Sequence, residues 1–305
     1  MCFSCFTFSY SGQIYTNPLI SEMSNSANEE VSVGVEEDCW DLPNEFDLYA
    51  KHEVGKIHFP GPSKDGCKRF KSTHAFLIEC IEPDSPLDLL NSSHSASKYD
   101  ATGHCIWAGA FLLIHSIHEL KKFAIANKRI IEFGTGTGIG GLAIMLADTD
   151  DVPLSVAFTD NDPDALDVCR RNCELNNIPA TSYSIEELTW GTGATKDDFD
   201  VALATDVLYD VDLIDPLFTS VTSCIRLNGI FILSHIPRAC YNEGNPPEAI
   251  EDLEGYIVDQ AKKIGLDLDT IIRPPLEDEI LVEQLEWCPK TAFAGGAILV
   301  FRRVV

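Results

Sequence analysis

Basic residues are scarce in this chain of 305 residues, where 22 Lys and Arg face 48 Asp and Glu and the formal net charge is −26. Nucleic-acid binding and docking on anionic lipid both need dense positive charge, so we expect neither a nucleic-acid nor a membrane partner. Long apolar runs are missing as well, since no segment reaches the roughly 18 apolar residues that a membrane-spanning helix needs. The acidic excess leaves two readings open, solubility or attraction to a basic partner.

Cysteine is too sparse for a disulfide scaffold, because the chain has 11, an odd number. Cys2 and Cys5 form a CxxC pair, but no second pair follows to complete a zinc site, and we expect no metal centre. The first 20 residues contain no Lys or Arg and no continuous apolar core, unlike a secretion signal or a transit peptide. These features favour a cytoplasmic location, with the nucleus as an alternative.

Composition divides the chain into three parts. Residues 1–40 contain no basic residue, and their stretch SEMSNSANEEVSVGVEED is polar and acidic, which predicts a disordered tail. Residues 41–100 hold two short strand patterns, FDLYAKHEVGKIHF and HAFLIECIEP, on either side of a loop rich in Pro, Gly and Lys. They indicate a small β-rich N-terminal extension. Residues 101–305 make up the main domain.

The main domain alternates between strand and helix patterns. The strand patterns are KRIIEFG, SVAFTD, FDVALATDVLY and GIFILSHIPR, with EQLEW and GGAILVFRR as closing strands. Helical patterns lie between them, such as IWAGAFLLIHSIHELKKFA and DPDALDVCRRNCELNN. This alternation predicts an α/β, Rossmann-like, doubly wound fold, in which helices cover both faces of a mostly parallel sheet.

The most informative segment is a glycine turn after the first of these strands. It contains Gly134, Gly136 and Gly138, and glycines here let the chain turn sharply and let a ligand approach the backbone. The segment also satisfies GxGxxG, so a dinucleotide and a plain tight turn both stay open. Glu132 precedes the turn by two residues; a carboxylate there would repel a pyrophosphate but suits an ammonium group, which favours S-adenosylmethionine.

Two further features suit a nucleoside. Asp160 ends the next strand, 22 residues after Gly138, and that spacing suits a carboxylate that accepts hydrogen bonds from ribose hydroxyls. Dehydrogenases share this feature, so it does not choose between cofactors. Trp190 precedes the strand FDVALATDVLY, where its ring can hold an adenine or pack in the core.

That strand pattern ends in Asp206-Val207-Leu208-Tyr209. With Glu132 and the glycine turn before it, the chain resembles the seven-β-strand methyltransferases that use S-adenosylmethionine. Within them it is similar to the protein-lysine methyltransferase group, whose D/E-x-x-Y/F motif this segment matches.

Two tryptophans extend the resemblance, which covers roughly residues 100–305. Trp107 matches the Trp that the group has in the helix before the glycine turn, and Trp190-Gly191 matches its Trp-Gly pair. One position departs, because Thr189 stands where members often have Asp.

The resemblance implies a seven-stranded sheet, S-adenosylmethionine as cofactor and two catalytic residues. Asp206 would orient the target amine and Tyr209 would line its channel; a helix N-cap and a packing role are the structural alternatives. The cofactor-binding residues it implies are Trp107, Glu132, Gly134, Thr135, Gly136, Gly138, Asp160, Asn161, Trp190 and Thr205.

The function we expect is methylation of a lysine side chain in a protein substrate. A small-molecule, nicotinamide-like N-methyltransferase and a non-catalytic methyltransferase-like binding protein are the alternatives, whereas Glu132 and the Asp206 motif disfavour a dehydrogenase. Asp210, Asp212 and Asp215 follow the motif, which favours a basic protein substrate. We expect the protein to act as a monomer.

Overall fold

A computed structural model describes residues 52–60, 71–81, 101–123, 125–147, 152–192, 198–237, 252–273 and 295–305. All of them belong to one compact unit, Pro43–Val305. The predicted tail of residues 1–40, Cys2 and Cys5, and the predicted strand EQLEW lie outside the described residues. Within the described part, no helix is long and apolar enough to cross a membrane, and no cluster of three or more potential metal ligands occurs.

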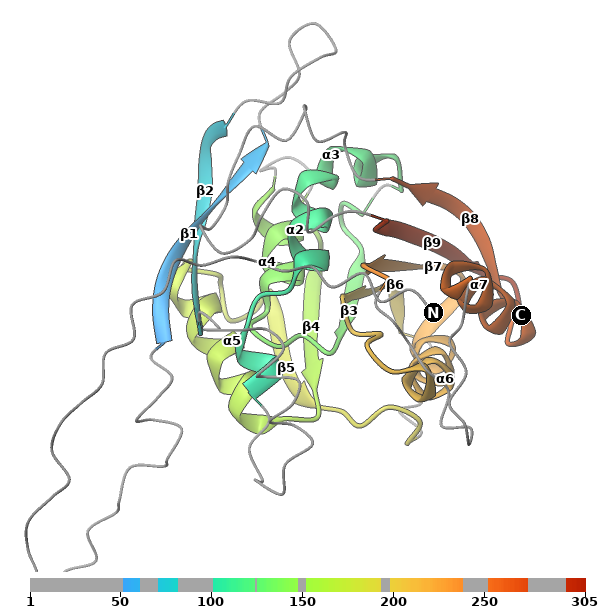
Figure 1. Cartoon of the computed structure of the whole chain (residues 1–305). Coiled ribbons are helices and arrows are strands. Elements are labelled where there is room, and N and C mark those ends of the chain that lie inside the picture. Colours follow the sequence, from blue (N-terminus) through green and yellow to red (C-terminus); the bar gives the residue numbers. More distant parts are fainter. Residues whose placement is uncertain are drawn as a thin grey trace, which may run out of the picture. The chain divides into compact units, whose positions relative to one another are not determined.

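The described residues form a seven-stranded sheet in the order β5-β4-β3-β6-β7-β9-β8 (Figure 1). The five strands from β5 to β7 run parallel, while β9 lies antiparallel between β7 and β8. The predicted fold class is therefore confirmed. The strands are β3 (Arg129–Phe133), β4 (Ser155–Asp160), β5 (Tyr183–Glu187), β6 (Phe199–Thr205), β7 (Ile225–His235), β8 (Leu266–Ile272) and β9 (Ala297–Arg303).

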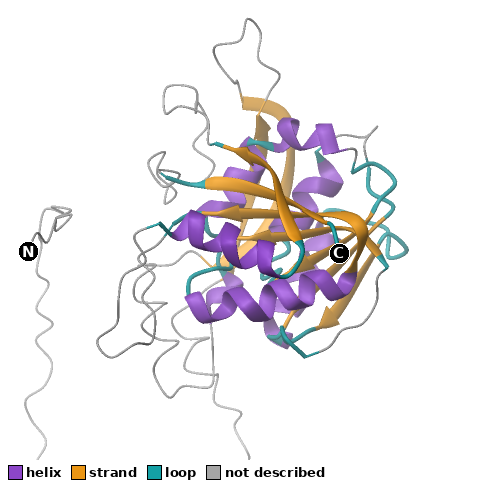
Figure 2. Ribbon diagram, turned by 90° about the vertical axis from the view of Figure 1, so that its right-hand side faces the viewer, coloured by secondary structure: helices purple, strands orange, loops and turns teal. Residues whose placement is uncertain are grey.

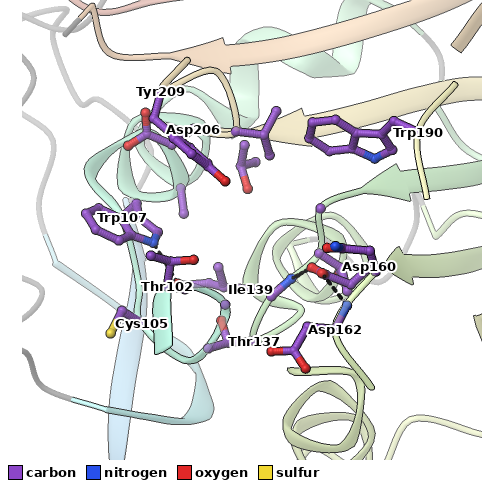
Figure 3. A pocket seen from close by; sticks show the side chains of 18 residues that line it. Thr102, Cys105, Trp107, Thr137, Ile139, Asp160, Asp162, Trp190, Asp206 and Tyr209 are labelled. Carbon is purple, nitrogen blue, oxygen red and sulfur yellow. Dashed lines mark hydrogen bonds between the residues drawn. The ribbon is translucent and has the colours of Figure 1, made fainter. Parts of the chain in front are cut away.

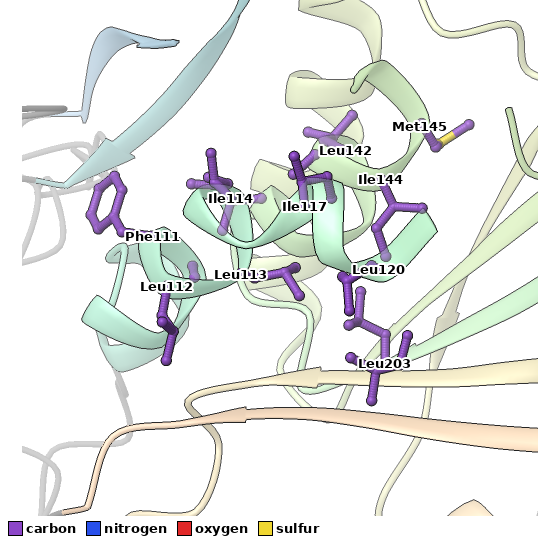
Figure 4. Packing of buried hydrophobic residues seen from close by; sticks show 14 of the residues in the cluster. Phe111, Leu112, Leu113, Ile114, Ile117, Leu120, Leu142, Ile144, Met145 and Leu203 are labelled. Carbon is purple, nitrogen blue, oxygen red and sulfur yellow. The ribbon is translucent and has the colours of Figure 1, made fainter. Parts of the chain in front are cut away.

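Alternate residues of the central strands enter two separate cores. Ile130 of β3 packs in the core under helices α2 to α5, and its neighbour Ile131 packs in the core under α6 and α7 (Figures 1 and 2). In the first core, Leu203 of β6 lies against the apolar side chains of α2, α3 and α4 (Figure 4). Both faces are thus covered, which explains the nearly continuous apolar runs of β3 and β6. The helices are α2 (Ala108–His115), α3 (Ile117–Leu120), α4 (Ile139–Leu146), α5 (Pro163–Leu175), α6 (Ile214–Cys224) and α7 (Leu253–Lys263).

The N-terminal extension contains an antiparallel hairpin of β1 (His52–Pro60) and β2 (Lys71–Ile81), as the sequence predicted. Ile57, Phe76 and Ile78 of this hairpin are buried in the first core. A shared core explains why the hairpin needs no core of its own: an isolated two-stranded hairpin is marginal in water. The hairpin contacts α2, α4, which follows the glycine turn, and the carboxyl-terminal half of α5.

Two predictions about elements were inaccurate. The single helix expected over residues 106–124 is divided near Ser116, whose amide donates to the carbonyls of both Leu112 and Leu113, and α3 and a 3₁₀ helix follow. The strand predicted over 199–209 ends at Thr205, so Asp206 and Tyr209 lie in the loop that follows it.

Candidate active site

A cavity lies at the carboxyl ends of β3, β4 and β6 (Figure 3). The sheet order reverses between β3 and β6, and open α/β sheets bind ligands at such a switch point. The cavity encloses about 850 Å³, including space open to solvent. It is lined by Thr102, Gly103, Cys105, Trp107, Ala110, Gly134, Thr135, Gly136, Thr137, Ile139, Asp160, Asn161, Asp162, Trp190, Thr205, Asp206, Val207 and Tyr209.

The glycine turn forms the floor of this cavity. Gly134, Gly136 and Gly138 all have positive φ, at 62°, 50° and 81°, a conformation that side chains disfavour. A Cβ on Gly136 would also lie 2.8 Å from the carbonyl oxygen of Gly103. The turn therefore packs directly against the 3₁₀ helix η2 (Ala101–His104), which supplies part of the cavity wall.

Asp160 is placed as the sequence predicted, at the end of β4 beside the turn. Its Oδ2 accepts a hydrogen bond from the amide of Gly136 at 2.9 Å, and its Oδ1 accepts one from the amide of Asp162 at 3.1 Å. Burial raises the pKa of Asp160, although these amide hydrogen bonds oppose the rise. The carboxylate thus fixes the turn to the loop before α5.

Glu132 and Gly138 do not line the cavity, unlike the other predicted cofactor residues. The fully buried carboxyl of Glu132 lies behind the turn, where its Oε2 accepts hydrogen bonds from the Thr135 hydroxyl at 2.7 Å and the Gly141 amide at 3.1 Å. Gly141 is in the first turn of α4, so Glu132 caps this helix. Gly138 faces α5, since a Cβ there would lie 2.6 Å from the sulfur of Cys169.

Two tryptophans flank the cavity on opposite sides (Figure 3). Trp107 precedes α2, and its ring nitrogen donates to the carbonyl of Thr102 at 2.9 Å, which closes the loop from η2 into that helix. Trp190 follows β5, and its ring would lie 3.1 Å from a Cβ on Gly134. Trp190 lies before β6 as the sequence predicted, whereas Trp107 lies just before the helix that was expected to contain it. Neither residue is fully buried, and their contact with a cofactor stays a prediction.

The predicted catalytic residues lie together beyond the end of β6 (Figure 3). Asp206 is only 4% exposed and has a φ of 60°, a strained left-handed conformation. Its Oδ2 accepts a hydrogen bond from the amide of Gly109 at 3.0 Å, so Asp206 caps α2 rather than the segment after it. Asp210 caps that following segment instead, through the amide of Asp212. Tyr209 is 45% exposed at the cavity.

The sequence prediction missed the η2 wall and the Thr137 hydroxyl. Thr137 is 1% exposed and lines the cavity, and its Oγ1 has no hydrogen-bond partner among the described residues. Buried hydroxyls are normally hydrogen-bonded, so this group is available to a ligand. The sequence holds a signal for it, because Thr137 lies inside the glycine turn, between residues that were predicted to bind the cofactor.

The charge of the cavity is negative. Asp160, Asp162 and Asp206 line it, and no Lys or Arg does so among the described residues. The amino end of α4, where a Rossmann fold would place a pyrophosphate, is already capped by Glu132. The cavity therefore suits a cationic or zwitterionic ligand better than an anionic dinucleotide.

The model of one protein family, described as lysine methyltransferase, matches residues 88–244. This chain belongs to that family. The match spans β3, β4 and β6, the glycine turn and the segment from Asp206 to Tyr209, so the recognition made from the sequence is confirmed.

Curated relatives agree with this membership. Protein-lysine N-methyltransferase EFM3 of Saccharomyces cerevisiae is 26% identical over 59% of this chain and 55% of its own length. Protein N-lysine methyltransferase METTL21A of Danio rerio is 31% identical over 34% of this chain and 47% of its own. Histone-arginine methyltransferase METTL23 of Mus musculus is 24% identical over 41% and 49%. The chain thus spans about half the length of the curated relatives it matches.

Proposed function

We propose that this protein binds S-adenosylmethionine and transfers its methyl group to a lysine side chain of a protein substrate. The single observation that carries the proposal is a switch-point cavity lined by three aspartates and by no Lys or Arg in the described part of the chain. S-adenosylmethionine carries a sulfonium and an ammonium group and no phosphate, so it fits this cavity, whereas NAD would bring two phosphates against three carboxylates.

The glycine turn and its neighbours would hold this cofactor. Asp160 offers carboxylate oxygens for ribose hydroxyls, and Trp190 offers a ring face for adenine. Thr137 offers a buried hydroxyl for a polar group of the amino-acid moiety. When bound, S-adenosylmethionine supplies an electrophilic methyl group on a sulfonium cation.

Asp206 and Tyr209 would position the acceptor. A lysine ammonium has no lone pair and must lose a proton before it can attack, and a partly desolvated channel favours the neutral amine. Asp206 is held rigidly by the Gly109 amide, so its carboxylate can orient the amine without moving. Positioning of this kind supplies much of the rate of a displacement reaction.

The substrate is, in our proposal, a basic segment of a protein. Three exposed carboxylates follow Tyr209 closely in the sequence, those of Asp210, Asp212 and Asp215. They add negative charge near the predicted channel. We further propose that the protein acts as a monomer in the cytoplasm, where its thiols stay reduced. Size-exclusion chromatography with light scattering tests whether the protein is a monomer.

Cofactor binding is tested by isothermal titration of the full chain with S-adenosylhomocysteine and with NAD. We expect saturable binding of S-adenosylhomocysteine and none of NAD. Binding of NAD alone would favour a dehydrogenase, and binding of neither would favour the non-catalytic alternative.

Transfer is tested with labelled S-adenosylmethionine, fractionated lysate and mass spectrometry of the modified protein. Asp206→Asn keeps an oxygen that can accept from the Gly109 amide, so the variant should fold and bind cofactor while its methylation rate falls by about 100-fold or more. Asp259→Asn, at an exposed carboxylate on α7 that does not line the cavity, is the control and should stay near the wild-type rate. Methylarginine, or methylation of nicotinamide alone, would contradict the proposed acceptor.

A further inference from the structure

A chain of ionisable side chains links the N-terminal hairpin to the wall of the candidate cofactor cavity. Nδ1 of His52 on β1 lies 3.2 Å from Oε1 of Glu79 on β2. Nε2 of the same ring lies 3.2 Å from Nδ1 of His104 on η2, and the two rings stack with centroids 5.4 Å apart. Nε2 of His104 in turn lies 3.8 Å from Oδ2 of Asp162, a cavity residue.

The contact between the two rings fixes their relative orientation. One of the two inner nitrogens must donate and the other must accept. Each ring also has a carboxylate on its outer side, Glu79 for His52 and Asp162 for His104.

Charged groups lie on both sides of the pair. Burial alone would raise the pKa of Asp162, yet His104, together with the amide of Asp164, brings it below its ordinary value. His104 is only 3% exposed at its side chain. Arg171 of α5 binds Glu79 through two nitrogens, at 2.8 and 3.1 Å, and Asp160 accepts from the amide of Asp162 at 3.1 Å.

The pair bears directly on the cavity because His104 ends η2. Gly103, its neighbour, packs on Gly136 of the glycine turn so closely that a Cβ would not fit between them. Thr102, Gly103 and Cys105 all line the cavity. A displacement of His104 therefore moves the wall against which a cofactor rests.

We propose that His52 is a positioning residue for cofactor binding, and that the His52–His104 pair holds the η2 wall against the glycine turn. This inference rests on the proposed binding of S-adenosylmethionine. Without the contact between the two rings the wall loosens, and cofactor affinity falls.

The test measures the dissociation constant of S-adenosylhomocysteine by isothermal titration of the full-length protein between pH 6 and 8.5. We expect His52→Gln to weaken binding about fivefold. His118→Gln is the matched control. His118 also ties β1 to the body, through the carbonyl of Pro60 at 3.1 Å, but it does not line the cavity.

A double-mutant cycle separates positioning through His104 from mere stability. His104→Gln should weaken binding about as much as His52→Gln, and the double variant should bind no more weakly than either single variant, because all three lack the same contact. Thermal unfolding of each variant, His118→Gln included, measures stability in parallel. Losses of affinity that add in the double variant, or that follow the fall in stability across all the variants, would overturn the inference.

The outcomes also distinguish this inference from the function on which it rests. If the wild type does not bind S-adenosylhomocysteine at any pH, the proposed function fails and the inference with it. If the wild type binds and a folded His52→Gln variant binds equally well across the pH range, only the inference is overturned.

Discussion

Glu132 is an ionisable side chain whose environment favours its neutral form. Its carboxyl is completely buried, and burial raises its pKa from 4.5 to about 8, although hydrogen bonds from Thr135 and Gly141 oppose the rise. Its Oε1 has no hydrogen-bond partner among the described residues. At neutral pH the folded protein therefore keeps a proton that the unfolded chain releases.

This proton makes stability depend on pH in a definite direction. Between about pH 4.5 and 8 the unfolded state binds fewer protons at this residue, so the free energy of unfolding falls as the pH rises, by at most about 5 kcal/mol. Glu132→Gln cannot ionise and should flatten this slope. Urea unfolding at pH 6 and 8.5 measures it, with Glu187→Gln, at an exposed carboxylate on β5, as the control. If the free energy of unfolding depends on pH as strongly in Glu132→Gln as in the wild type, another group binds the proton.

Substitution of Thr137 should change cofactor binding without lowering the stability of the fold. Thr137→Val removes a buried hydroxyl that has no partner among the described residues, so the variant should be at least as stable as the wild type. Its affinity for S-adenosylhomocysteine should fall about fivefold, the value of one hydrogen bond. Thr137→Ser should restore affinity.

Thermal unfolding and isothermal titration of both Thr137 variants check this pair of expectations. A Thr137→Val protein that binds as tightly as the wild type would show that the hydroxyl does not contact the cofactor.

Sequence reasoning reached most of the residues around the cavity. Residue type and position along a strand were enough for Asp160, Asp206 and the glycines, because parallel strands bring their carboxyl ends to one edge. The direction in which a side chain points was not readable. For this reason the sequence does not show that Glu132 caps α4 from behind the turn, nor that the Thr137 hydroxyl is buried without a partner among the described residues. The chemical roles of these residues stay predictions.

At the scale of elements, two asparagines attach β2 to α5. Asn176 accepts from the amide of Leu77 at 2.8 Å and donates to its carbonyl at 2.6 Å. One turn earlier, Asn172 does the same for Glu79, at 2.6 and 3.0 Å, and also donates to the carbonyl of Thr137 at 2.9 Å. The spacing of i and i+4 on the helix thus matches alternate residues on the strand.

Removing these amides should have unequal effects. Asn172→Ala leaves buried backbone groups of β2 and the glycine turn without partners and should lower the free energy of unfolding by about 3 kcal/mol. Asn176 is partly exposed, so water can replace its amide, and Asn176→Ala should cost about 1 kcal/mol. Urea unfolding of the two variants measures both values. Equal losses would contradict the difference in burial.

The elements that sequence patterns missed have weak apolar signals. β5 is an edge strand whose residues are mostly exposed or half-buried, and β8 is the opposite edge, with three exposed residues in sequence. Periodicity reports burial, so edge strands with little burial escape it. The strands β3, β4 and β6 could be predicted because most of their residues are buried and give a strong apolar signal.

At the scale of the whole molecule, net charge should govern the approach of a protein substrate. If the substrate is basic, its KM should rise several-fold between about 50 and 300 mM salt, because salt screens charges more than a Debye length apart. Binding of S-adenosylhomocysteine inside the cavity should change much less and is the internal control. Initial rates at fixed cofactor, together with titrations in the same buffers, measure both. A salt-independent KM would leave the acidic excess as a solubility feature.

The fold class could be predicted from the sequence because alternating elements of this length allow few arrangements. The antiparallel direction of β9 could not be predicted, since the apolar pattern of GGAILVFRR is the same for a parallel and an antiparallel strand. Whether the chain is best described as the three parts 1–40, 41–100 and 101–305 stays a prediction.

The place of β9 has a consequence for biosynthesis. β9 is made after every other described strand, yet it lies inside the sheet between β7 and β8. Until Ala297–Arg303 has left the ribosome, both of its neighbours present an open edge, and open edges invite pairing with other chains. The nascent protein is therefore exposed to aggregation until β9 emerges, and a premature stop before Ala297 would leave it permanently in that state.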